Sequence, residues 1–83
     1  MTYHTGIYDE DDVPADVISK MKELCKFNHI DLRKFDFCQL VNEVGIEYTL
    51  SYEHPESDVS IHLIFKRNES DQIIEERFEL TQD

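Results

Sequence analysis

Four histidines and a run of carboxylates are the residues that could bind a metal ion. His4, His29, His54 and His62 fall on four different predicted segments, and no pair has a spacing such as His-x3-His. Structural zinc sites normally show clustered Cys or His ligands. The acidic run Asp9–Asp12 lacks the alternating oxygen ligands and the central glycine of an EF-hand loop. The sequence therefore predicts no metal site and no cofactor.

The residues that could act in catalysis are not arranged for it. Two glycines are too few for a phosphate-binding loop. Ser57 and Ser70 lie in predicted turns without the pattern of a nucleophile elbow. Glu75 and Glu79 would lie ~13–14 Å apart along one strand, too far for the carboxylate pair of a glycosidase. His62 is expected as a surface residue of a sheet rather than a general base. We therefore expect that the protein is not an enzyme.

The net charge restricts the partners that the protein can bind. The chain has 83 residues with 19 acidic and 8 basic side chains, a formal net charge of −11. Phosphates repel such a protein, so we expect neither direct binding to nucleic acid nor binding to an anionic membrane. A basic partner protein is favoured instead. A hydrophobic content of 40% argues against disorder, and the length predicts a single domain over residues 1–83.

The N-terminal segment and the two cysteines predict a cytoplasmic protein. Residues 1–6 contain no basic region and no apolar run, so we expect no secretory signal. The longest apolar run, Leu63–Phe65, is far too short to span a bilayer. Cys25 and Cys38 are isolated within apolar stretches, so both are expected to be reduced thiols in the core rather than a disulfide.

A first helix is predicted after the acidic run. Pro14 suits the first turn, Asp11 or Asp12 can cap it, and the helix runs to about Asn28. Carboxylates before the helix also meet the positive end of its dipole. The residues on and beside its apolar face are Val17, Ile18, Met21, Leu24 and Cys25.

A second helix is predicted from Leu32 to Val44. Asp31 is a plausible cap, and Gly45 suits the left-handed position after a helix. The apolar stripe of this helix would be Phe37, Leu40, Val41 and Val44. The alternation over residues 35–37 leaves a strand as the minority alternative.

In the rest of the chain, the spacing of apolar residues changes from that of a helix to every second residue, the spacing of a strand. Apolar and polar residues alternate over residues 46–53, 59–66 and 73–80, which predicts three half-buried strands. The linkers between them are short and rich in turn residues, so consecutive antiparallel hairpins are expected. Residues 3–8 allow a further edge strand. We therefore predict an α+β fold in which two helices pack on one face of a three- to four-stranded antiparallel β-meander.

The C-terminal half of the chain is the more acidic. Residues 1–44 have nine acids and five bases, net −4, and residues 45–83 have ten acids and three bases, net −7. Side chains on one face of a strand recur every ~6.6–6.8 Å, so acids there form a row that resembles the phosphates of a nucleic acid. The predicted partner-binding residues lie on outer strand faces and in turns: Glu47, Glu53, Glu56, Asp58, Glu69, Asp71, Glu75 and Glu79. The plainer alternative is that these acids are the solvated surface of an ordinary acidic protein.

One stretch of the chain resembles a known family. Pro55–Asp58 opens a predicted strand that contains His62, and Glu69–Asp71 forms the acidic turn that follows. The phage uracil-DNA glycosylase inhibitors have a similar arrangement, are close to this length, are strongly acidic and have two helices on an antiparallel sheet. The resemblance implies an inhibitor of a DNA-handling enzyme. That family uses a Glu-Ser-Ile contact motif, whereas Asp58 follows Glu-Ser here, so no interface residue is transferred.

These observations together predict a small acidic DNA-mimic protein inhibitor. It would block the basic nucleic-acid-binding groove of a DNA- or RNA-handling enzyme, such as a DNA glycosylase, a nuclease or a CRISPR effector. Such activity is typical of phage counter-defence, including anti-CRISPR proteins, and would place the protein in the host cytoplasm. Ile64 or Ile73 on the predicted outer face is expected either as an apolar anchor or as buried under a second layer. The alternatives are an immunity protein or antitoxin against a basic nuclease, and an acidic structural interaction module.

Overall fold

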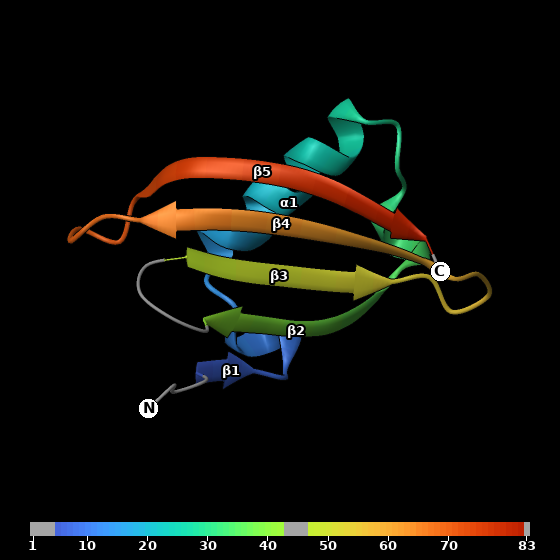
Figure 1. The fold of residues 1–83 in the computed structure, drawn as a ribbon, viewed down its shortest axis with the longest axis horizontal. Helices are drawn as coiled ribbons and strands as arrows, with labels where there is room; N and C mark the ends of the chain where they lie inside the picture. Colours follow the sequence, from blue (N-terminus) through green and yellow to red (C-terminus); the bar gives the residue numbers. More distant parts are fainter. Residues whose placement is uncertain (1–4, 43–46, 83) are drawn as a thin grey trace.

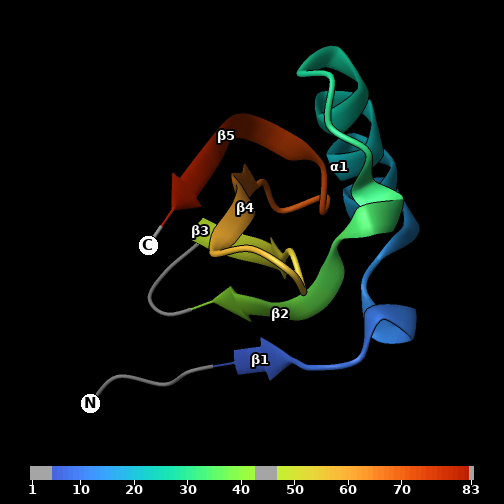
Figure 2. The ribbon, with the colours of Figure 1, turned by 90° about the vertical axis from the view of Figure 1, so that its right-hand side faces the viewer.

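Five antiparallel strands form one sheet, and an α-helix covers one of its faces (Figures 1 and 2). The computed structural model describes residues 5–42 and 47–82. The strands are β1 (Thr5–Ile7), β2 (Asp36–Asn42), β3 (Glu47–Glu53), β4 (Val59–Arg67) and β5 (Ile73–Gln82), and the helix is α1 (Ala15–Phe27). Two 3-10 turns, η1 (Glu10–Asp12) and η2 (Leu32–Lys34), precede α1 and β2. The strands lie in the sheet in chain order, so every neighbour in the sheet is also the next strand of the chain.

Helix α1 confirms the first predicted helix, and its buried side chains explain its position. Val17, Met21 and Cys25 follow each other at intervals of four, so they form one stripe, and all three are buried in the core. At the other end of the helix, the side-chain amide of Asn28 donates to the carbonyl of Leu24 at 2.7 Å. The backbone N–H of Asn28 donates to the same carbonyl at 3.0 Å, so Asn28 closes the end of the helix with two hydrogen bonds.

The acidic run does not cap α1 as the sequence suggested. Pro14 is the N-cap residue and makes no side-chain hydrogen bond to the helix. The acids form η1 instead, in which Asp9 Oδ1 accepts from the backbone N–H of Asp11 at 3.0 Å. The expected cap at Asp11 or Asp12 is therefore wrong, because the carboxylate run is used to begin its own short turn.

The core lies between α1 and the helix-side face of β3 and β4. Leu50 lies opposite Leu63, and Tyr52 opposite Ile61, and all four side chains are buried. Directly opposite residues of an antiparallel pair project from the same face of the sheet, so these pairs form one apolar layer. The strands predicted over residues 46–53, 59–66 and 73–80 are confirmed within the described residues as β3, β4 and β5. Strand β1 confirms the edge strand expected within residues 3–8.

The second predicted helix is wrong, because η2 and strand β2 occupy its place. A β-bulge at Cys38 explains the error. Phe37 faces Tyr52 and Leu40 faces Leu50, both on the helix side, because the register shifts between Phe37 and Gln39. The bulge sets two core-facing side chains three residues apart, a spacing that also indicates a helix. The expected end of that helix, at Val44 and Gly45, lies outside the described residues.

The fold is therefore one α-helix on a five-stranded sheet within the described residues, and not two helices on a three- to four-stranded meander. In the same part of the chain, no helix combines the length and the apolar character needed to cross a bilayer. Both cysteines are free: Cys25 is buried in the core, whereas Cys38 is half-buried at the bulge.

Candidate functional site

The face of the sheet opposite α1, called the outer face below, carries half of the predicted partner-binding acids. The cross-strand register places Glu47 beside Lys66, and Lys66 beside Glu75. It also places Glu79 beside His62. The predicted residues on this face are Glu47, Glu53, Glu75 and Glu79. Because antiparallel neighbours lie side by side, strands β3 to β5 bring these acids to one surface.

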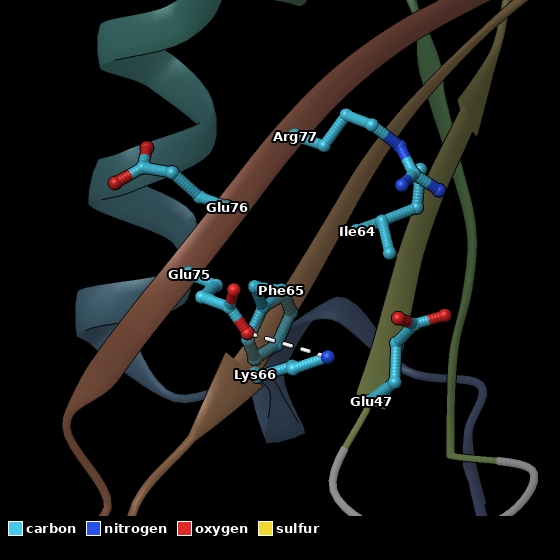
Figure 3. Close-up of a pocket in the computed structure, with 7 residues that line it drawn as sticks. All are labelled: Glu47, Ile64, Phe65, Lys66, Glu75, Glu76 and Arg77. Atoms are coloured by element: carbon cyan, nitrogen blue, oxygen red, sulfur yellow. Dashed lines mark ion pairs between the residues drawn. The ribbon is translucent and has the colours of Figure 1, made fainter.

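Basic residues interrupt the acids on the outer face. A pocket of about 280 Å³ lies on this face. In Figure 3 the ammonium of Lys66 points toward the carboxylate of Glu75, and the two groups are 3.3 Å apart. The guanidinium of Arg77 lies 3.0 Å from Glu79. Two of the predicted acids are thus neutralised by neighbours, and the acids do not form an uninterrupted row.

Ile64 and Ile73, the two expected anchors, offer little exposed apolar surface. Ile64 lies on the outer face but is only 8% exposed. Its direct cross-strand neighbour, Arg77, extends its side chain across it (Figure 3). Ile73 lies opposite Arg67 after a register shift and packs against the core. The Arg77 side chain therefore covers Ile64, and the register shift between β4 and β5 turns Ile73 inward.

The four predicted acids in turns lie at two opposite ends of the sheet. Glu56 and Asp58 belong to the turn between β3 and β4, and Glu69 and Asp71 to the turn between β4 and β5 (Figure 1). Strand β4 has nine residues, so the two turns lie on the order of 30 Å apart. The structure brings each pair together but does not bring the two pairs to one place.

The end of the sheet at the β3–β4 turn gathers four exposed acids, which we call the acidic end. Its members are Asp36, Glu53, Glu56 and Asp58. Asp36 begins β2 and lies directly opposite Glu53 at the end of β3. The turn is ordered locally, since His54 Nδ1 accepts from the backbone N–H of Glu56 at 3.1 Å. Asp36 was missed from the sequence because it was assigned to a helix; the alternation of residues 35–37 was the signal that could have found it.

The cations of β4 and β5 are all engaged by carboxylates. Besides the two pairs already described, Arg67 lies 3.0 Å from Asp16 at the start of α1, and it also donates to the backbone carbonyl of Asp71. Six predicted acids, in contrast, have no ion-pair partner among the described residues: Glu47, Glu53, Glu56, Asp58, Glu69 and Asp71. The predicted acids that remain unpaired therefore lie at the two ends of the sheet.

His62 takes part in a hydrogen-bonded chain across three strands of the outer face. Its Nδ1 lies 2.9 Å from Ser51 Oγ, and its Nε2 lies 3.0 Å from Thr81 Oγ1. Ser51 itself is buried. Both ring nitrogens are thus occupied by hydroxyl groups, an arrangement that orients the imidazole and crosslinks the strands.

A second pocket, on the helix side, was not anticipated from the sequence. It has a volume of about 610 Å³ between α1, η2 and β3, with Tyr52 and Cys25 among its lining residues. The Tyr52 hydroxyl donates to Glu10 Oε2 at 2.5 Å. Burial raises the pKa of the Cys25 thiol to about 11, and burial together with the bond to Glu10 raises the pKa of Tyr52. Both groups are therefore held neutral at physiological pH.

The described residues contain no group of three or more His, Cys, Asp or Glu side chains that could hold a metal ion. Comparison with protein-family models, with curated proteins and with solved structures finds no match for this chain. The arrangement of charge on the sheet is therefore the observation from which a function can be argued.

Proposed function

We propose that this protein is a small acidic inhibitor that binds the basic nucleic-acid-binding groove of a DNA- or RNA-handling enzyme. The acidic end would make the principal contact, and the acids of the β4–β5 turn would make a second one. Basic side chains that normally hold phosphates would pair with these carboxylates. Long-range attraction would speed the encounter, and short-range pairing would hold the complex.

The position of Asp36 opposite Glu53 carries this proposal. The two acids face each other directly across β2 and β3, and neither has an ion-pair partner among the described residues. Like charges directly opposite each other destabilise an antiparallel pair. On a surface that is only solvated, this repulsion costs stability without any benefit. In a binding site, a basic group of the partner would relieve it and so strengthen the complex.

The free acids at both ends of the sheet support an extended contact rather than a single point of binding. The ends are separated by the length of β4, and the surface between them carries Lys66 and Arg77 in ion pairs. A partner groove would therefore present cations at two places and tolerate a mixed surface between them. The wider negative charge of the chain supplies the steering.

Uracil-DNA glycosylase is the first enzyme to assay, because of the resemblance around residues 55–71; a nuclease panel and CRISPR effectors follow. We expect inhibition at ~50 mM salt that is lost at several hundred millimolar, since screening weakens charge pairing. We also expect that duplex DNA competes with the protein for the enzyme. The proposal is overturned if no nucleic-acid enzyme, from these panels or from an affinity pull-down of host lysate, binds the protein at either salt concentration.

A matched pair of double variants separates the acidic end from total charge. Asp36→Asn with Glu53→Gln is expected to weaken inhibition about tenfold or more, because it removes two contacting carboxylates. Asp11→Asn with Glu23→Gln removes the same charge from exposed positions on η1 and α1, and it should change inhibition less than about twofold. Equal losses in both variants would show that net charge alone, and not this end of the sheet, governs binding.

A further inference from the structure

Strand β5 presents a long free edge. With ten residues it extends from Ile73 to Gln82, and it is the last strand of the sheet, so no described strand pairs with its outer edge. An edge strand exposes a row of unpaired N–H and C=O groups that can template another strand. Strand β1, at the other edge, comprises three residues in the described part of the chain. The β5 edge is therefore the place where this sheet can be extended.

Exposed apolar side chains gather near the same edge. Among the described residues, large apolar side chains are exposed by half or more at Tyr8, Phe27, Ile74 and Leu80. Ile74 and Leu80 belong to β5. Phe27 is the last residue of α1, and Figures 1 and 2 both show this end of the helix reaching past β5. Three of these four side chains would therefore lie near a strand added to β5.

The charges of β5 are complementary to those of a second, antiparallel copy of the same strand. On its outer face, Glu75, Arg77 and Glu79 alternate in sign. A two-fold axis between antiparallel strands places each residue opposite the one that lies equally far from the axis in the other direction along the chain. Directly opposite residues project from the same face of the sheet. With Phe78 on the axis, Arg77 of each copy lies opposite Glu79 of the other. Arg77 and Glu79 already form an ion pair within each chain, and this contact extends it with two ion pairs between the chains.

We propose that a second copy of this chain pairs antiparallel with β5, with Phe78 on the two-fold axis. The neighbouring registers are unfavourable. With the axis at Glu76 or at Glu79, the carboxylate of that residue lies opposite the same carboxylate of the second copy. With the axis at Arg77, two guanidinium groups lie opposite each other. Like charges directly opposite each other destabilise a strand pair. Charge therefore favours the register on Phe78 over these three neighbouring registers.

This axis is perpendicular to the sheet, so both helices stay on the same face of a continuous ten-stranded sheet. The end of α1 that passes β5 in Figure 1 then lies on the side where the second copy begins. Phe27, 83% exposed in the single chain, becomes covered by the partner copy. Each chain carries a charge of −11, so mutual repulsion keeps this association weak and dependent on screening.

Analytical sedimentation of the chain alone tests this proposal independently of the proposed function. The experiment is done at ~0.15 M salt, where a Debye length of about 8 Å screens the repulsion between the two chains. We expect a concentration-dependent dimer. Arg77→Glu and Glu79→Arg should each weaken dimerisation by about tenfold or more, and the double variant should restore it to within about threefold. The two single variants change net charge in opposite directions, so general repulsion cannot weaken both.

Asp11→Arg, in η1 directly after β1, is the matched control for Glu79→Arg and should not weaken the dimer. Hydrogen exchange gives a second measurement, since β5 amides that face away from β4 should become more protected as protein concentration rises. A chain that stays monomeric up to ~1 mM overturns the proposal. So does a dimer that persists in both single variants, because it must then use another surface.

Discussion

Asp36 at the start of β2 and Glu53 at the end of β3 lie directly opposite each other. Both charges act on the thiol of Cys38: burial first, and then the charges of Glu53 and Asp36, raise the pKa of Cys38. The free chain therefore carries a repulsion at this end of the sheet that a bound basic group would relieve.

Replacement of Glu53 with Gln should stabilise the free protein while it weakens the proposed complex. The variant removes one member of a like-charge cross-strand pair, so we expect the free energy of unfolding to rise by about 0.2–1 kcal/mol. Urea denaturation measures this change. Glu56→Gln removes the same charge from the adjacent turn, where no acid lies directly opposite, and should change stability by less than about 0.5 kcal/mol. A Glu53→Gln variant less stable than the parent would contradict the argument.

The hydrogen bond from Tyr52 to Glu10 should make stability depend on alkaline pH. Tyr52 is 2% exposed, and burial and the bond to Glu10 raise its pKa above the usual value of 10.0. Because the pKa is higher in the folded chain than in the unfolded chain, this contribution is complete below pH ~10 and is lost as the pH rises above it.

The Tyr52→Phe variant tests this dependence. It should cost about 1 kcal/mol at neutral pH, since it removes one hydrogen bond to a carboxylate at the surface. The fall in melting temperature above pH ~10 should also become shallower than in the parent. Tyr8→Phe is the control, because Tyr8 is 71% exposed and should leave the pH profile unchanged. If the melting temperature fell equally with pH in the parent and in Tyr52→Phe, Tyr52 would not be the source of the alkaline loss of stability.

The two thiols should differ in reactivity. Cys25 is 1% exposed and burial raises its pKa to about 11, so both access and thiolate formation are suppressed. Cys38 is only half-buried, and its pKa is raised mainly by burial. A disulfide reagent at neutral pH should therefore modify Cys38 first, and Cys25 only as fast as the protein unfolds. The single variants Cys25→Ser and Cys38→Ser assign the two phases. Modification of Cys25 faster than Cys38 would contradict the structure.

The parts of the fold that could be predicted are those with one uninterrupted period. Residues of α1 recur at intervals of four, β3 and β4 alternate along their length, and β5 alternates from Glu75 onward, after its register shift, so the helix and these strands follow from the sequence. Strand β2 could not be assigned, because the bulge at Cys38 gives Phe37 and Leu40 a helical spacing on a strand. Three of the four acids of the acidic end could be predicted, since Glu53, Glu56 and Asp58 follow from alternation and turns. Asp36 was missed for the same reason as β2, because its position depends on the register of that strand.

A substitution at Gln39 distinguishes the strand from the helix that was first expected. Gln39 is exposed on the outer face of β2, opposite Ser51. β-Branched residues suit a pleated strand and lose rotamer freedom in a helix. We therefore expect Gln39→Thr to raise the free energy of unfolding by up to about 0.5 kcal/mol. Lys22→Thr, at an exposed position of α1, is the matched control and should lower it by about 0.5 kcal/mol. Denaturant titration of both variants decides the matter, since a loss at Gln39 equal to that at Lys22 would mean that residue 39 is helical.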